Sequence, residues 1–183
     1  NQKNWQELIR PNKLDVQPGR DRRRVATVVA EPLERGFGIT LGNALRRVLL
    51  SSLQGAAITS VKIEGVEHEF MTIPEVAEDV TDIILNLKDV VLTSASDEPL
   101  TLRLDVRGPA EVTAGDIQAN SDVEILNKDL HIATLNAKAR LAVDLTVDRG
   151  KGYLSALGRN SSTIGVIPID AIFSPVRRVT FSV

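Results

Sequence analysis

The spacing of hydrophobic residues along this chain changes near residue 90, from a helical period to a period of two. Before that point, one segment has the spacing of a single helical face, with apolar side chains at Leu41, Ala44, Leu45, Val48 and Leu49. We predict that this helix starts at Thr40, whose hydroxyl can accept a backbone N–H of the first turn, and that it ends near Ser51-Ser52.

A second amphipathic helix is predicted between residues 72 and 88. Its apolar positions share one face: Val76, Val80, Ile83, Ile84 and Leu87. Thr72 and Glu75 have the spacing of a capping box, and Pro74 suits the first turn, so we expect the helix to begin at Thr72.

The remaining pattern predicts strands. Apolar and polar residues alternate regularly over 100–107 and 141–147, and the segments 25–30 and 57–66 also favour extended structure. We predict shorter strands at 123–126, 132–135, 164–169 and 176–183, and turns at 108–109, 127–129 and 149–152. Because alternation indicates strands with one solvated face, we expect an α+β fold with mostly antiparallel sheet.

Each predicted helix carries one leucine on its polar face. Leu50 is about 180° from Leu41 around the first helix and is flanked by Arg46 and Arg47. On the second helix, Leu85 points away from the apolar face. A leucine framed by arginines is typical of protein interfaces, so the two helices indicate a scaffold that docks partners.

Composition excludes several kinds of function. The 183 residues suffice for one domain or two small lobes, and a net charge of −2 gives no global attraction for nucleic acid. The chain has no cysteine and only two histidines, which excludes disulfides and thiol catalysis and makes a multi-histidine metal centre implausible. With neither a membrane-length apolar stretch nor a signal peptide, we expect a soluble, cytoplasmic protein.

Two segments hold candidate binding chemistry. Gly36, Gly38 and Gly42 lie between a predicted strand and a helix, but their spacing is not that of a dinucleotide-binding loop. A tight turn or close helix packing explains them better, and a small nucleotide-binding protein remains the alternative. The basic run 20–24 is interpreted first as a solvated loop and second as a phosphate contact.

No active site is predicted from the titratable residues. His68 lies between two glutamates and His131 stands alone before a strand, and the sequence does not bring the two together. Glu78, Asp79 and Asp82 fit a solvated helix flank better than a metal site. We therefore predict no catalytic, cofactor-binding or metal-ligating residues.

One long segment is far more specific. The chain resembles the α subunits of bacterial DNA-directed RNA polymerases at Glu31-Pro-Leu-Glu-Arg-Gly-Phe-Gly-Ile-Thr-Leu-Gly-Asn-Ala-Leu-Arg-Arg-Val-Leu-Leu-Ser-Ser52. Supporting stretches are 63–69, 78–88, 112–117, 149–153 and 173–176. The segment 49–57 is similar to α-proteobacterial versions.

The resemblance implies two lobes and three sets of contacts. Residues 1–54 with 177–183 would form a dimerisation lobe, and residues 55–176 an inserted, mostly antiparallel β lobe that contacts the large subunits. The implied contacts are those with a second α subunit at Phe37, Leu41, Leu45 and Val48, with the β subunit at Arg46, Arg47 and Leu50, and with the β′ subunit at Asp82, Lys88, Ile169 and Val176.

The resemblance also implies a function. Such a subunit makes no phosphodiester bond itself, although it belongs to a nucleotidyltransferase, and its homodimer nucleates assembly of β and then β′. In this family the chain continues past the position of Val183 with further strand, a second dimerisation helix, a linker and a DNA-contacting domain. We therefore expect no cofactor and no specific DNA contact from residues 1–183.

Overall fold

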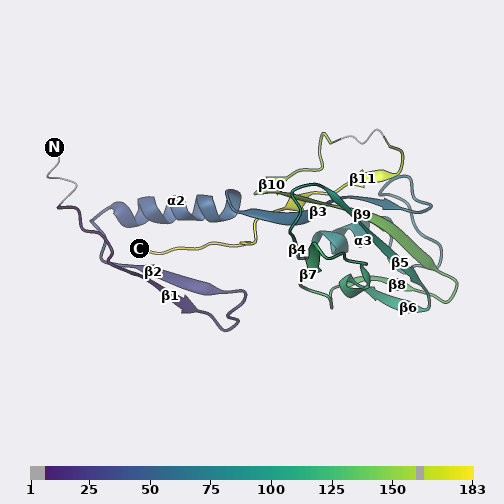
Figure 1. Cartoon of the computed structure of the whole chain (residues 1–183), viewed down its shortest axis with the longest axis horizontal. Coiled ribbons are helices and arrows are strands. Elements are labelled where there is room, and N and C mark those ends of the chain that lie inside the picture. Colours follow the sequence, from purple (N-terminus) through teal and green to yellow (C-terminus); the bar gives the residue numbers. More distant parts are fainter. Residues whose placement is uncertain (1–6, 160–162) are drawn as a thin grey trace. The chain divides into compact units, whose positions relative to one another are not determined.

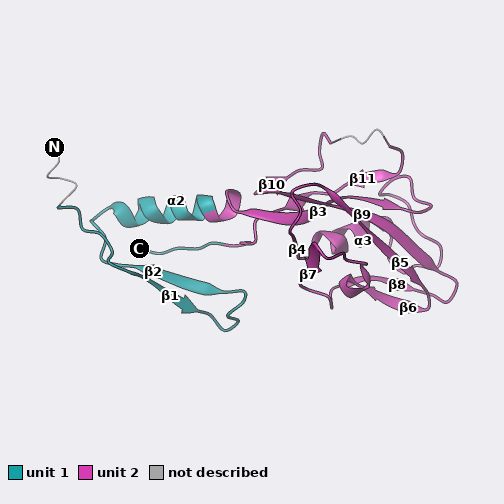
Figure 2. Cartoon of the chain, in the orientation of Figure 1, with its two compact units in different colours: residues 1–48, 179–183 teal, residues 49–178 magenta. Residues whose placement is uncertain are grey.

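The computed structural model describes residues 7–159 and 163–183, which divide into two compact units (Figure 2). Unit 1 comprises residues up to Val48 together with Val179–Val183, and unit 2 comprises Leu49–Arg178. Helices and antiparallel strands occur together in the chain, which confirms the predicted α+β class (Figure 1). No helix among the described residues is long and apolar enough to cross a membrane.

Unit 1 contains a β-hairpin and most of one helix. Strand β1 (Leu14–Pro18) pairs antiparallel with β2 (Ala26–Ala30), and Val16 lies opposite Val28. Strand β2 was predicted, but β1 was not, although Leu14 and Val16 already alternate with polar neighbours.

Helix α2 (Phe37–Ser51) begins earlier than predicted. Gly36 adopts a φ of +89°, and the Phe37 N–H donates to the Glu34 carbonyl at 3.1 Å, so a tight turn leads directly into the helix. Thr40 therefore lies inside α2, and its assignment as the N-cap is wrong.

The predicted strand at 176–183 is also wrong, because these residues form no strand in the structure. Their last part lies along α2 instead: the Arg46 Nε donates to the Val179 carbonyl at 3.4 Å, while Phe181 and Val183 lie over Gly42 and Gly38. A β pattern needs a neighbouring strand to accept its hydrogen bonds, and none of the described strands pairs with this segment.

Unit 2 is built on a four-stranded antiparallel sheet of order β11-β3-β9-β5. Its strands are β3 (Gln54–Ile63), β5 (Leu100–Arg107), β9 (Arg140–Lys151) and β11 (Val166–Pro168). The alternation over 100–107 predicted β5 correctly, whereas β9 runs through the turn expected at 149–152. There Gly55 lies opposite Gly150, and a Cβ on either glycine would overlap Phe173, so these glycines serve close packing rather than a turn.

Three two-stranded ribbons complete unit 2. They pair β4 (Leu92–Ser94) with β7 (Val123–Ile125), β6 (Ala110–Thr113) with β8 (His131–Leu135), and β10 (Tyr153–Leu154) with β12 (Ala171–Ile172). A short 3-10 turn, η1 (Ala114–Asp116), follows β6.

Helix α3 (Val80–Lys88) starts eight residues later than predicted. Asp79 is its N-cap, with the carboxylate accepting the Asp82 N–H at 2.8 Å, so the capping box expected at Thr72 is wrong. The preceding residues cannot be helical because their backbone bonds the end of β8: the Ala77 N–H donates to Thr134 at 3.1 Å, and Val76 bridges Leu135.

A single large core joins α3 to the sheet and to the β4–β7 and β6–β8 ribbons of unit 2. Val80, Ile83 and Leu87 of α3 are completely buried, which confirms the predicted apolar face at these three positions, while Ile84 is half-buried. A smaller cluster of Ala57, Ala171 and Phe173 packs beside β3. Unit 2 thus has the buried apolar area that a stable domain needs.

Candidate docking sites

Helix α2 presents an apolar face that the chain itself leaves open. Phe37, Leu41, Leu45 and Val48 fall within about 80° of one another around the helix, and we call these four residues the open face. Leu45 is 45% exposed and Val48 47% exposed. No described residue of unit 1 is buried, so this unit lacks the apolar core that unit 2 possesses.

The glycines of α2 lie on a neighbouring side of the helix, which the chain covers. A Cβ built on Gly38 would come within 2.6 Å of the Val183 side chain, and one on Gly42 would overlap the Phe181 ring. The absence of a Cβ at both positions lets residues 179–183 approach the helix closely, above all at Gly42, where the Phe181 ring lies. They sit inside a covered helix rather than in a loop after a strand, so the structure gives no support to the nucleotide-binding alternative.

Arg46, Arg47 and Leu50 occupy the last two turns of α2. Arg46 and Arg47 are exposed, and Leu50, which belongs to unit 2, is half-buried. The Arg46 Nε is directed to the Val179 carbonyl, which fixes the side chain along the helix. Exposed guanidinium groups next to an apolar residue can donate to carboxylates or carbonyls of a partner protein.

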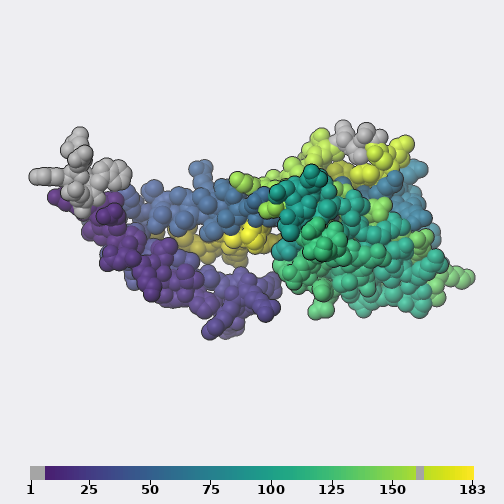
Figure 3. Space-filling view, in the orientation of Figure 1, coloured from purple at the N-terminus to yellow at the C-terminus, as the bar shows by residue number. Residues whose placement is uncertain are grey.

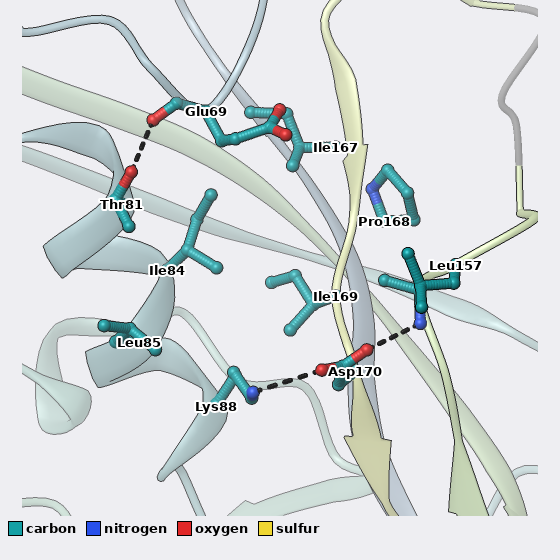
Figure 4. Close-up of a pocket in the computed structure, with 11 residues that line it drawn as sticks. Glu69, Thr81, Ile84, Leu85, Lys88, Leu157, Ile167, Pro168, Ile169 and Asp170 are labelled. Carbon is teal, nitrogen blue, oxygen red and sulfur yellow. Dashed lines mark hydrogen bonds and ion pairs between the residues drawn. The ribbon is translucent and has the colours of Figure 1, made fainter.

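Unit 2 carries a groove of about 290 Å³ between α3 and the segment 167–170 (Figure 4). Its apolar lining comes from α3, from β11 and the residues after it, and from the segment after β10: Ile84, Leu85, Ala156, Leu157, Ile167, Pro168 and Ile169. Two of these lining residues are exposed at the surface: Leu85 is 51% exposed and Leu157 is 90% exposed. The polar lining consists of Glu69, Thr81, Lys88 and Asp170.

Hydrogen bonds hold the walls of the groove in place. Lys88 Nζ lies 3.4 Å from Asp170 Oδ2, and the Ala156 N–H donates to Asp170 Oδ1 at 2.6 Å, so one carboxylate ties α3 to two other segments. The Ala156 N–H and, to a smaller extent, the Lys88 ammonium lower the pKa of Asp170, because both favour its ionised form. The Thr81 hydroxyl donates to the Glu69 carbonyl at 2.8 Å at the other end.

Arg159 also holds the residues that follow β10. Its guanidinium donates to the carbonyls of Ser155, Thr59 and Ile169. These hydrogen bonds hold the residues after β10 against the sheet. The groove is therefore a preformed feature of unit 2 with a largely apolar lining.

The residues predicted to contact β′ are only partly brought together. Lys88 and Ile169 both line the groove, but Ile169 is 1% exposed and so forms its floor. Asp82 is exposed on the first turn of α3. Val176 lies elsewhere: its N–H donates to the Ser174 hydroxyl, which in turn donates to the Leu49 carbonyl at 2.7 Å, at the end of α2.

Sequence reasoning missed most of the groove, including Leu157 and Asp170. Nothing in the local sequence distinguishes Leu157 from a buried leucine, because its segment has no clear period. Asp170 could not be found either, since its partners lie 14 and 82 residues away. The exposure of Leu85, by contrast, was predicted from helical spacing and is confirmed.

His131 is not isolated, as its sequence position implied. Its Nε2 lies 2.8 Å from Glu78 Oε1 and its Nδ1 lies 3.2 Å from Glu111 Oε1, so the imidazole joins β6 and β8 to the residues before α3. The hydrogen bond with Glu78 raises the pKa of His131. Burial alone would raise the pKa of Glu78, but hydrogen bonds from Thr134 and His131 outweigh it and lower that pKa.

This cluster shows no sign of catalysis or metal binding. His131 hydrogen-bonds both Glu78 and Glu111, and Glu78 Oε2 also accepts the Thr134 N–H at 2.7 Å. Among the residues that the structure describes, no group of three or more histidine or acidic side chains is arranged to hold a metal ion. The cluster is best explained as a tie between strands.

A protein-family model matches most of unit 2. Residues 61–174 match the family described as the RNA polymerase Rpb3/RpoA insert domain. The matched residues contain α3, the groove, the strands β5, β9 and β11 and the end of β3, and they lie entirely within unit 2.

Proposed function

The chain belongs to the RNA polymerase Rpb3/RpoA insert domain family, and on that premise we propose that it is a non-catalytic assembly subunit of a DNA-directed RNA polymerase. In this proposal two copies dimerise through unit 1 and then recruit the large subunits, first β and then β′. The subunit works in the cytoplasm and holds the enzyme together without taking part in phosphodiester bond formation.

The observation that carries this proposal is the absence of any buried residue among the described residues of unit 1. Ordering a chain costs conformational entropy that burial of apolar surface must offset, and a hairpin with one helix does not provide that burial alone. The open face therefore needs a cover.

A second copy of the same chain fits this face. The four side chains of the open face are all apolar, so two such helices can pack against each other without bringing like charges together. A twofold arrangement would place the same residues on both sides, as symmetric dimers require. Leu14, Val16 and Val28 of the hairpin are also exposed and add apolar area to the same unit.

Contacts with the large subunits are proposed on two further surfaces. Arg46, Arg47 and Leu50 are assigned to the β subunit, supported by the exposure of both arginines. Asp82, Lys88, Ile169 and Val176 are assigned to the β′ subunit. The groove supports the assignment of Lys88 and Ile169, which line it, because it offers a preformed apolar floor with exposed leucines at its edge.

The dimer is tested with two matched substitutions on α2. Val48→Glu puts a charge in the open face, whereas Ile39→Glu puts the same charge on another exposed, β-branched residue, about 180° away around the helix. We expect sedimentation equilibrium of the full subunit to show dimers for the wild type and for Ile39→Glu, and monomers for Val48→Glu. A Val48→Glu protein that remains dimeric at micromolar concentration would contradict the proposed interface.

A further inference from the structure

The connection between β1 and β2 concentrates positive charge at a fixed turn. The Gly19 N–H donates to the Val25 carbonyl at 2.8 Å, and the Asp21 carbonyl accepts the N–H groups of Arg24 and Val25. These backbone bonds close residues 19–25 into a defined loop at the end of the hairpin (Figure 1). We call Arg20, Arg22, Arg23 and Arg24 the arginine tip.

All four side chains of the arginine tip are exposed, and residues 19–25 form part of the surface in Figure 3. Asp21, the acid within the run, forms no ion pair with these guanidinium groups, and its carboxylate accepts the Arg23 backbone N–H at 3.0 Å. Within residues 7–159 and 163–183, no carboxylate or carbonyl accepts a hydrogen bond from these guanidinium groups.

Three arginines of unit 2 are used differently. Arg103 contacts Asp144 at 2.9 Å, Arg140 contacts Asp105 at 2.8 Å, and Arg149 contacts Asp97 at 2.6 Å. Those ion pairs join strands and loops of unit 2, whereas the guanidinium groups of the arginine tip form no ion pair with the described residues. Its charge is available to a ligand.

The charge of the tip also contrasts with that of the rest of the chain. Residues 20–24 carry a net charge of +3, so a total of −2 leaves −5 for all other residues. The chain as a whole therefore has no basic field that attracts a polyanion, and the tip is its densest run of positive charge.

From these features we propose that the arginine tip binds the phosphate backbone of duplex nucleic acid without sequence preference. The guanidinium fork matches two phosphate oxygens at once, and consecutive arginines on a narrow turn can reach successive phosphates. An acidic protein segment is the less suitable partner, since protein interfaces are built around an apolar or aromatic centre and residues 20–24 contain none. The same lack of aromatic rings leaves nothing on which unpaired bases could stack.

The salt dependence of binding tests this proposal. A fluorescently labelled DNA duplex of 20 base pairs and arbitrary sequence is titrated with the full chain, and anisotropy is followed between 50 and 200 mM KCl. Each phosphate neutralised contributes about −0.9 to the slope of log affinity against log salt, so four contacts predict a slope of about −3.6 and a loss of roughly 100-fold over this range.

Two triple variants separate the tip from overall charge. Arg22→Ala/Arg23→Ala/Arg24→Ala removes most of the tip, and Arg107→Ala/Lys128→Ala/Lys138→Ala removes the same charge from exposed positions of unit 2. We expect the first variant to reduce the slope to about −1 and the second to leave it near the wild-type value. Circular dichroism of both variants checks that the fold is intact.

Three results would overturn the proposal: no binding of the wild type to the duplex at 50 mM KCl, equal slopes for the two triple variants, or tighter binding of the tip to polyglutamate than to DNA at equal salt. The last result would assign the tip to an acidic protein partner. None of these outcomes depends on dimerisation through the open face, which the Val48→Glu experiment tests separately.

Discussion

At Gly38 and Gly42 the absence of a side chain had two explanations, close packing and nucleotide binding. Their position between a predicted strand and a helix left nucleotide binding open as the alternative to close packing, and in the structure both glycines face residues 179–183. The sequence supported the packing explanation only as the better of two, because nothing nearby indicated which residues would approach. Contacts of this kind join positions more than 130 residues apart, and no local pattern encodes them.

Arg47 permits a direct test of the proposed β contact. Replacing it by Ala removes a guanidinium on the polar side of α2, about 120° from Leu41 and so away from the open face. We expect Arg47→Ala to weaken recruitment of the β subunit by about tenfold, the usual scale for an interface arginine, without dissociating the dimer.

Titration of labelled β subunit into the full-length dimer measures this loss. Arg107→Ala, which removes an exposed arginine of β5, is the matched control and should bind β normally. Unchanged β affinity in Arg47→Ala would remove this residue from the contact, and a monomeric Arg47→Ala protein would mean that the assigned helix faces are wrong.

His131 makes the stability of unit 2 dependent on pH. Because its folded pKa is raised above 6.5, the ion pair with Glu78 stabilises the fold fully below about pH 6.5 and is lost as pH rises through the folded value. The lowered pKa of Glu78 limits the ion pair at acid pH. The stabilisation that the Glu78 carboxylate provides is present above about pH 4.5 and is lost as pH falls through the pKa of Glu78 in the folded state. The tie is therefore strongest between these limits.

Urea unfolding at pH 6.0 and pH 8.5 measures the effect. We expect the wild type to lose less than about 1 kcal/mol over this interval, since the imidazole is partly exposed, and His131→Gln to lose less than the wild type. His68→Gln alters the other histidine, whose Nδ1 accepts the Phe70 N–H at 3.2 Å, and should keep the wild-type dependence. Identical pH profiles for wild type and His131→Gln would contradict the assignment.

Elements with a clear period were predicted well, and elements defined by their neighbours were not. The alternation over 100–107 gave β5 with its observed bounds, and helical spacing placed Ile83 and Leu87 inward with Leu85 outward. Short strands were predicted unevenly: β7 was found and β4 and β6 were missed, because three or four residues show too little of a period to separate strand from loop. The start of α3 was misplaced because residues 75–77 bond the end of β8, a tertiary pairing that overrides a local capping signal.

The candidate sites divide in the same way. The outward position of Leu85 and the shared face of Leu41, Leu45 and Val48 follow from helical spacing alone, whereas Phe37 was named only through the resemblance and the exposure of this face is visible only in the structure. The groove brings together α3, the segment after β10 and the segment after β11, and its ion pair joins residues 82 positions apart. Such an arrangement depends on the sheet order and so becomes visible only in three dimensions.

Two leucines of α3 provide a test at the level of this element. Leu87 is completely buried and Leu85 is 51% exposed, so Leu87→Ala leaves a cavity whereas Leu85→Ala does not. We expect Leu87→Ala to lower the free energy of unfolding by about 2–5 kcal/mol and Leu85→Ala to change it by less than about 0.5 kcal/mol. Thermal or urea unfolding followed by circular dichroism measures both, and similar losses in the two variants would show that the phase of α3 is wrong.

At the scale of the whole molecule, the two units have different requirements. Unit 2 has its own core and a preformed groove, as expected of a module that folds by itself and offers surfaces to partners. Unit 1 has no buried residue in its described part and presents apolar side chains on both the helix and the hairpin. An assembly subunit explains both, because the interface that completes unit 1 is then also the step that begins assembly.

The stoichiometry of the first complex with a large subunit tests this account most directly. Full-length subunit is mixed with purified β subunit alone, and the mass of the resulting complex is measured by native mass spectrometry. We predict two copies of this chain bound to one β subunit, with no complex that contains a single copy, because dimerisation precedes recruitment. A stable complex of one copy with one β subunit would contradict the account.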